Sequence, residues 1–421
     1  MSTSMLVEPA ESRETVRRTG GMVWIYLLLG LLSVATIRVI TGAHEIDSEG
    51  SLRAAIVATC PILLAALGGL WSERSGVVNI GLEGQMLLGT WGAAYFTYYY
   101  GPYWGLIGAV LFGVAGGVIH GLATITFGVD HIVSGVALNV IALGLTTFLA
   151  EQKFAELDSP YGHGGAQQLT GLQKPLSITI PGISDGAASL AGKHWFLVSD
   201  LAAFVAAITH NVSIVTLIVF VLVAVTGWAL WRTSFGLRLR SCGENPHAAE
   251  SLGVNVRLYK YAAVLVSGGM AGLGGGYLAL VSSPGFHTNQ TNGRGYIGLA
   301  AMIFGNWRPG GILVGSGMFG YTDSLQLRDP GVIHALLALI GFWLVVFALF
   351  KVWRKQMTVS TWVLGGFGVG FLLWFFLTDT VPSQFAGMTP YIATLLVLAF
   401  ASQRLRMPKA DGQVYRKGAV G

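Results

Sequence analysis

Long apolar runs alternate with short polar connections over almost the whole chain. A helix needs about 20 apolar residues to cross the hydrocarbon core of a bilayer, and most runs approach that length, although some are short or interrupted. We therefore expect an all-α polytopic membrane protein with broken or re-entrant segments. The pattern predicts about 12 crossings, at residues 22–41, 54–71, 84–100, 104–127, 131–150, 212–231, 261–282, 296–305, 311–327, 331–350, 358–378 and 389–402.

The composition excludes a water-soluble protein. Hydrophobic residues make up 53% of the 421 residues and charged residues only 11%, whereas roughly a quarter of a soluble domain is charged. Glycine is also abundant, with 59 residues. Small residues let membrane helices approach closely, so the glycine content indicates helix packing.

Basic residues gather in alternate connections, which predicts the topology. The positive-inside rule places these connections and both termini in the cytoplasm, and the acidic residues 44–50 outside. The same bias explains the net charge of +5, so nucleic acid is not an expected partner and membrane lipid is. The cytoplasmic basic residues are Arg13, Arg17, Arg18, Arg232, Arg238, Arg240, Arg257, Lys260, Lys351, Arg354, Lys355, Arg404, Arg406, Lys409, Arg416 and Lys417.

The pattern also divides the chain into regions. A cytoplasmic tail at 1–21 precedes a transmembrane domain at 22–402, and a second cytoplasmic tail occupies 403–421. The first apolar run is too long for the core of a signal peptide and has no cleavage site after it, so we expect a retained first span. Within the transmembrane domain we expect an extracytoplasmic loop at 151–211, a cytoplasmic loop at 232–260 and an extra pair of spans at 331–380.

Two polar stretches interrupt the apolar pattern at membrane depth. They lie at 71–85 and 305–311, and the residues at 79–89 faintly resemble those at 296–305. Paired interruptions in two halves of a chain are typical of transporters built from repeats, with the substrate path at the repeat interface. Glycines spaced by four also occur twice, which predicts close helix contacts. They are Gly113, Gly117 and Gly121, and Gly268, Gly272 and Gly276.

The cytoplasmic loop at 232–260 predicts a short helix. Asn245 suits the N-cap position, Pro246 the first helical position and Gly253 the C-terminal end. Such a helix at the membrane surface could dock into a groove of a partner protein; the alternative is an ordinary basic connector. The residues assigned to docking are Glu244, Asn245, Pro246, Ala248, Ala249 and Gly253.

Five residues are candidates for the substrate path, because strongly polar groups at membrane depth are costly and usually face a cavity or the bundle interior. Asn79 and Glu83 share a face if their stretch is helical, but they could instead bond the backbone of a broken helix. Asn139 is as suited to an interhelical hydrogen bond as to substrate. Asn306 and Trp307 lie at the second interruption, where the indole could stack on a base or anchor the membrane interface.

Catalytic and cofactor motifs are not found. The G-x4-G-K-[ST] loop that binds nucleotide phosphates is missing from the sequence, so we do not expect this chain to hydrolyse ATP. His44 and Glu45 begin like a zinc-protease motif, but Ser48 occupies the position of the second histidine. We predict no enzyme, no metal and no cofactor.

Three separated motifs resemble the nucleoside permeases within the branched-chain amino acid and ribose class of ABC importers. They are the run at 72–84, the loop around Asn245 and Pro246, and the run at 295–309. Ala248, Ala249 and Gly253 are similar to the EAA-x3-G coupling loop of import permeases, with His247 where Glu usually stands. The resemblance is weakest at 151–211 and 329–384.

The resemblance implies a permease subunit of the inner membrane that moves nucleosides inward. It implies partner subunits that hydrolyse ATP, a second permease subunit and an extracytoplasmic binding lipoprotein. Two alternatives remain open: a permease for ribose, other simple sugars or branched-chain amino acids, and an ion-coupled secondary transporter that uses Glu83 as its relay.

Overall fold

The computed structural model describes residues 29–30, 32–159, 162–165, 167–325, 330–378, 381, 405–416 and 418. The chain divides into two compact units, and each is described by itself. Unit 1 takes its described residues from 1–52, 180–208 and 327–386, and unit 2 from 53–179, 209–326 and 387–421.

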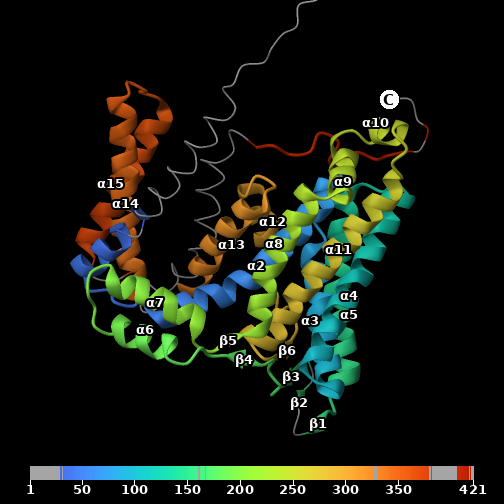
Figure 1. The fold of residues 1–421 in the computed structure, drawn as a ribbon, viewed down its shortest axis with the longest axis horizontal. Helices are drawn as coiled ribbons and strands as arrows, with labels where there is room; N and C mark the ends of the chain where they lie inside the picture. The colour runs from blue at the N-terminus through green and yellow to red at the C-terminus, as the bar shows by residue number, and fades with distance from the viewer. Residues whose placement is uncertain are drawn as a thin grey trace, which may run out of the picture. The chain divides into compact units, whose positions relative to one another are not determined.

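Unit 2 is a bundle of helices that contains the two predicted interruptions and the loop at 232–260 (Figure 1). Five-residue π-helical segments at Leu122–Thr126 and Leu278–Ser282 continue α4 and α11. The helices are α2 (Glu49–Arg74, which begins in unit 1), α3 (Leu82–Tyr100), α4 (Pro102–Gly121), α5 (His131–Phe154), α8 (Ile214–Arg232), α9 (Ser234–Glu244), α10 (Pro246–Ser251), α11 (Val256–Tyr277), α12 (Arg294–Phe304) and α13 (Pro309–Ser324).

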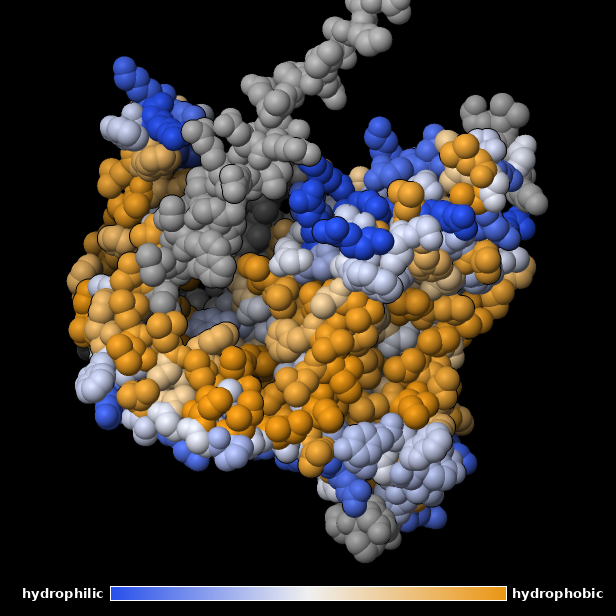
Figure 2. All heavy atoms as spheres, in the orientation of Figure 1, coloured by the Kyte–Doolittle hydropathy of each residue, from blue (hydrophilic) through white to orange (hydrophobic). Residues whose placement is uncertain are grey.

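The helices coincide closely with the predicted apolar runs, which confirms a helical polytopic membrane protein. Seven of the described helices are long and apolar enough to cross a membrane, and the shorter apolar helices include Leu32–Thr41 and α12. The surface over α8 and α11 is hydrophobic, and hydrophilic residues gather beyond it over α9 (Figure 2). The predicted run at 389–402 lies outside the described residues, as do residues 22–28 and 31 of the run at 22–41.

The all-α prediction missed two small antiparallel sheets. The first has the strand order β1-β2-β3-β6 and aligns Leu169 with Phe286, and the second pairs β4 with β5. Strands of two to four residues give no detectable alternation of apolar and polar positions, so the sequence pattern did not indicate them. The strands are β1 (Asp158–Ser159), β2 (Gly162–Gly165), β3 (Gln168–Thr170), β4 (Ser177–Ile178), β5 (Val212–Ser213) and β6 (Gly285–His287).

The two predicted glycine rows pack against each other, joining α4 to α11. A Cβ atom at Gly113 would lie 2.2 Å from the carbonyl oxygen of Gly268, and one at Gly272 would lie 2.3 Å from that of Ala109. Gly89 of α3 approaches Gly272 just as closely. Because any side chain would collide with backbone here, glycine is what allows these three helices to touch.

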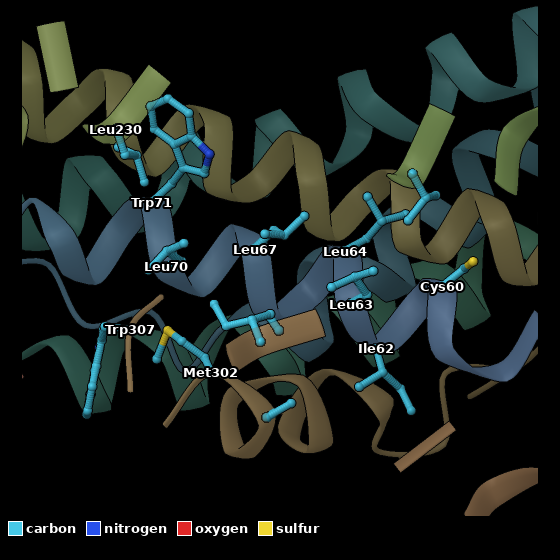
Figure 3. Close-up of a cluster of buried hydrophobic side chains, with 14 of the residues drawn as sticks. Cys60, Ile62, Leu63, Leu64, Leu67, Leu70, Trp71, Leu230, Met302 and Trp307 are labelled. Carbon is cyan, nitrogen blue, oxygen red and sulfur yellow. The ribbon is translucent and has the colours of Figure 1, made fainter. Parts of the chain in front are cut away.

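The main apolar core of unit 2 surrounds α2. Leu63, Leu67 and Leu70 are fully buried there, and Trp71 and Trp307 pack against the same cluster (Figure 3). Within this core, the indole N–H of Trp71 donates to the hydroxyl of Thr226 on α8 at 3.2 Å. The core therefore fixes the C-terminal end of α2, where the first interruption begins.

Unit 1 contains α6 (Ile183–Ala191), α7 (Val198–Thr209), α14 (Pro330–Trp353) and α15 (Val359–Leu377). The helices α14 and α15 occupy the predicted extra pair of spans at 331–380. A buried ion pair joins Arg38 to Asp200 at 2.7 Å, with Asp47 on the same guanidinium nitrogen at 3.8 Å. Burial, reinforced by the neighbouring Asp200, raises the pKa of Asp47 to about 8.

Candidate functional site

The short helix predicted in the loop at 232–260 is present as α10. The side chain of Asn245 accepts a hydrogen bond from the N–H of Ala248 at 3.0 Å and caps the helix, and Pro246 takes the first helical position. Gly253 follows the helix with a φ of +81°, and a Cβ atom there would meet nothing within 4 Å. Backbone conformation, not space, therefore favours glycine at this position.

The two alanines of α10 lie on different faces. Ala249 is buried and packs against Cys242 and Val256, whereas Ala248 is exposed. Leu252, just beyond the helix, is 85% exposed. A pocket of about 690 Å³ adjoins this region, lined by Glu250, Gly253, Val254, Asn255, Val256, Arg257, Leu258, Tyr261 and Tyr415. The exposed face of α10 and this pocket form a surface that a partner protein could contact.

Histidine side chains satisfy the backbone of the first interruption, between α2 and α3. The Nε2 of His120 lies 3.0 Å from the carbonyl oxygen of Val78, and the Nδ1 of His131 accepts from the N–H of the same residue at 3.2 Å. The hydroxyl of Ser72 donates to the carbonyl oxygen of Val77 at 2.6 Å. Non-helical backbone at membrane depth needs such partners, because lipid offers none.

Asn139 holds the end of the same interruption from α5. Its side-chain oxygen accepts the N–H of Gly84 at 2.8 Å, and its amide nitrogen lies 3.1 Å from the carbonyl oxygen of Ile80 and 2.8 Å from the hydroxyl of Tyr296. One side chain thus bonds α3, the interruption and α12. The sequence suggested two roles for Asn139, and this geometry corresponds to the interhelical hydrogen bond.

Both carboxylate oxygens of Glu83 carry hydrogen bonds. One accepts from the hydroxyl of Thr291 at 2.6 Å and the N–H of Gly293 at 2.8 Å, and the other accepts the N–H of Gly295 at 2.6 Å. Gly293 is the N-cap of α12 and has no side chain with which to cap it. Glu83 supplies the negative charge that a helix N-terminus favours, so it caps α12 from α3.

Asn79 does not share a helical face with Glu83, because α3 begins only at Leu82. Its amide nitrogen instead donates to the side-chain oxygens of Gln85 at 3.0 Å and Ser267 at 2.8 Å, and the residue is fully buried. Asn79 therefore bonds Ser267 of α11, whereas Glu83 bonds the N-terminus of α12.

The second interruption, between α12 and α13, bonds to the end of α2. Asn306 and Trp307 both have a φ of +52°. The indole N–H of Trp307 donates to Glu73 at 2.6 Å, and its carbonyl oxygen accepts from the Arg74 guanidinium at 2.7 and 3.2 Å. The side-chain oxygen of Asn306 accepts the N–H of Arg406 at 2.7 Å.

The five path candidates thus fall into two groups at opposite ends of α12. Glu83 and Asn139 bond the N-terminal region of α12, with Asn79 nearby at the start of α3, and Asn306 and Trp307 follow the C-terminus of α12. Trp307 is 3% exposed, so its ring lies in the core and bonds Glu73 (Figure 3). Contact of these residues with substrate stays a prediction.

Sequence reasoning missed several residues that join the interruptions to the loop at 232–260. Lys260, counted only as a positive-inside residue, is 2% exposed and donates to the carbonyl oxygen of Gly76 at 3.3 Å. The roles of His120 and His131 were also missed; histidine in an apolar span was the available signal, since such a ring needs a partner. Nothing in the local pattern indicated the contacts of residues 405–416.

Residues 51–349 match the family described as the branched-chain amino acid transport system permease component. The chain belongs to this permease family. The guanosine ABC transporter permease protein NupQ of Bacillus subtilis is 33% identical to this permease over 373 residues, which cover 87% of this chain and 96% of that protein.

Two further relatives extend the comparison. The nucleoside ABC transporter permease protein NupC of Lactococcus lactis is 32% identical over 86% of this permease and 95% of its own length. The putative glucose ABC transporter permease protein TsgC13 of Haloferax volcanii is 34% identical over 69% of this permease and 80% of its own length. No solved structure matches the chain.

Proposed function

We propose that this permease is the membrane subunit of an ABC importer that moves nucleosides inward across the inner membrane. One observation carries the substrate class: relatives named for guanosine and nucleoside transport align with 86–87% of the chain. A match over almost the whole length includes both interruptions and the cytoplasmic loop, which are the parts that a transport cycle uses.

The exposed face of α10 supports a division of labour with partner subunits. ATP binding and hydrolysis in separate subunits would move α10, and α10 would pass that motion to the membrane helices. A second permease subunit would complete the path, and an extracytoplasmic binding lipoprotein would deliver the substrate. The docking residues are Glu244, Asn245, Pro246, Ala248, Ala249 and Gly253, of which Ala248 and Gly253 are exposed on α10 and just beyond it.

The two interruptions support a path beside α12. Changes at either end of this helix would alter the surroundings of Asn79, Glu83 and Asn139 or of Asn306 and Trp307, and so reshape the cavity during the cycle. We propose about 12 crossings with both termini in the cytoplasm, the loop at 151–211 outside and the loop at 232–260 inside. This arrangement follows the charge distribution of the connections.

A sugar permease is the second candidate, because a relative named for glucose transport is 34% identical over 69% of the chain. An ion-coupled transporter with Glu83 as its relay is a third possibility. The hydrogen bonds of Glu83 disfavour it, since three donors already occupy the carboxylate.

Uptake of labelled guanosine and uridine tests the proposal directly. Cells with and without the chain are compared before and after ATP depletion, and separately after collapse of the ion gradients. We expect uptake that requires both the chain and ATP and that excess unlabelled ribose or glucose does not reduce.

Each alternative has its own outcome in the same experiment. Competition by glucose or ribose would support the sugar permease. Uptake that follows the ion gradient and survives ATP depletion would support the secondary transporter, and either result would overturn the nucleoside importer.

A further inference from the structure

A C-terminal segment, residues 405–416, runs across the ends of α9 and α10 (red in Figure 1). We call this segment the strap. Its first anchor is the hydrogen bond from the N–H of Arg406 to Asn306, at the second interruption. Its second anchor is on the cytoplasmic loop, where the N–H of Ala410 donates to the carbonyl oxygen of Gly243 at 2.9 Å.

Tyr415 forms the third anchor, on the docking helix itself. Its side chain is 9% exposed and belongs to the same apolar cluster as Ala249, the inward-facing alanine of α10. The ring also lies 5.7 Å from that of His247, measured between centroids. Tyr415 therefore contacts α10 through His247 and the cluster that contains Ala249.

Three backbone segments meet between these anchors, at Gly76. A Cβ atom at Gly76 would lie 3.1 Å from the carbonyl oxygen of Ala410 and 3.2 Å from the Cα of Gly243, and Gly76 has a φ of +84°. A Cβ atom at Gly243 would lie 2.4 Å from the carbonyl oxygen of Arg74. The strap, the cytoplasmic loop and the end of α2 thus pack in direct backbone contact.

Charged groups surround the strap at this junction. The carboxylate of Asp411 lies beside that of Glu73 and near the charged groups of Lys260 and Arg74. Glu73 and Arg74 are the residues that bond Trp307. A displacement of the strap at Asp411 therefore changes the surroundings of Glu73 and Arg74, the two residues that bond the second interruption.

We propose that Tyr415 and Asp411 are positioning residues, through which the strap ties α10 to the interruption at Asn306 and Trp307. When a partner displaces α10, the strap moves Arg406 and Asp411 with it, and the bonds at the end of α12 rearrange. The inference rests on the proposed function, because it describes how the motion of the docking helix reaches the substrate path.

The test uses the complete transporter in proteoliposomes. Tyr415→Ala removes the ring that contacts α10, Tyr415→Phe keeps the ring, and Val414→Ala alters an adjacent exposed residue that is 44% accessible. We expect Tyr415→Ala to lower nucleoside uptake per ATP hydrolysed by about tenfold, in the range of measured coupling between sites. KM should be unchanged, and Tyr415→Phe and Val414→Ala should behave like the wild type.

A second measurement does not depend on the substrate. Amide hydrogen exchange at residues 305–308 is followed while the partner ATPase binds a non-hydrolysable ATP analogue. We expect the exchange rate to change in the wild type and in Tyr415→Phe, but not in Tyr415→Ala or in Asp411→Asn.

The outcomes separate the two proposals. Absence of nucleoside uptake by the wild type counts against the proposed function alone, since the exchange experiment still tests the strap. A wild-type ratio of uptake to ATP hydrolysis in Tyr415→Ala, or an unchanged response at residues 305–308, would overturn the role of the strap.

Discussion

Buried polar side chains in this permease serve mainly as partners for backbone. Asn139, His120 and His131 bond the interruption between α2 and α3, and Glu83 bonds the N-terminus of α12. A backbone N–H or C=O group at membrane depth costs free energy unless it is hydrogen-bonded. By bonding such groups, each of these side chains offsets the cost of breaking the helix.

Glu83→Gln tests whether the carboxylate has a structural role or contacts substrate. A neutral amide accepts with one oxygen and presents an NH2 group to at least one N–H donor, so we expect a loss of about 1–3 kcal/mol of stability. Thermal unfolding in detergent measures this loss, with the exposed Glu156→Gln as the control. A raised KM for nucleoside with unchanged stability would instead place Glu83 in the path.

Attachment of the strap should weaken as pH rises. Burial raises the pKa of Asp411 to about 7, while the contact with Glu73 and the charges of Lys260 and Arg74 oppose the shift, and a free aspartate titrates near 4. The docked strap thus holds a proton that the free strap releases, so attachment is strongest below about pH 4 and weakens up to about pH 7. The protection factor of residues 405–416, which is amide exchange corrected for the intrinsic base-catalysed rate at each pH, should be higher at pH 5 than at pH 8.

Asp411→Asn provides the control for this pH dependence. The amide does not titrate, so the difference in protection factor between pH 5 and pH 8 should largely disappear. Glu73 is the other carboxylate facing Asp411, and a pH dependence that survives in Asp411→Asn would assign the titration to Glu73 instead.

At the scale of elements, the contrast between the two faces of α10 refines the docking prediction. Replacing both alanines by Glu would confuse two effects, because Ala249 packs inside the loop and only Ala248 is exposed. The glycine rows of α4 and α11 are a second example. There too, the effect of a substitution depends on whether its side chain would lie on the face that packs against the neighbouring helix.

Ala248→Glu isolates the docking contact. A charge buried at an interface without a partner costs about 2 kcal/mol or more, which corresponds to about a thirtyfold loss of affinity. We expect loss of ATP-dependent uptake with a normal amount of protein in the membrane, measured by labelled uptake and immunoblotting. Ser234→Glu, exposed on α9, adds the same charge to the same loop, and an equal loss in both variants would contradict docking through α10.

Gly272→Ala tests the packing of α4 against α11. A Cβ atom there would lie 2.3 Å from the carbonyl oxygen of Ala109 and 2.7 Å from the Cα of Gly113. Forcing the helices apart should cost about 1–3 kcal/mol. Gly144→Ala in α5 is the matched control, since its Cβ meets nothing within 4 Å and alanine favours the helix by about 1 kcal/mol. In detergent, the unfolding temperature should therefore fall in Gly272→Ala and rise in Gly144→Ala, relative to the wild type.

At the scale of the whole molecule, local sequence patterns predicted the helices. They did not predict contacts between residues that are far apart in the sequence. Apolar length indicated the helices, and Asn245, Pro246 and Gly253 indicated α10, because caps and turns depend on neighbouring residues. The partner of Glu83 lies 208 residues away at Thr291. Such pairs follow from how helices are arranged, which the spacing along one helix does not determine. The strap escaped prediction for the same reason.

The proposed topology leads to a labelling experiment on the whole protein. Both cysteines, Cys60 and Cys242, are buried, and burial raises the pKa of Cys242 to about 11, so its thiol is unreactive at neutral pH. The natural chain should therefore give little background with a membrane-impermeant maleimide. Ser189 on α6 and Ser251 on α10 are both exposed, and they belong to loops predicted to lie outside and inside.

Ser189→Cys should react in intact cells, and Ser251→Cys only after the membrane is permeabilised. The reason is the charge of the two loops: basic residues concentrate around α9 and α10, and the positive-inside rule retains such loops in the cytoplasm. Labelling of Ser251→Cys from outside would invert the topology. It would also remove α10 from the reach of cytoplasmic ATPase subunits, so the coupling role of α10 and of the strap depends on this result.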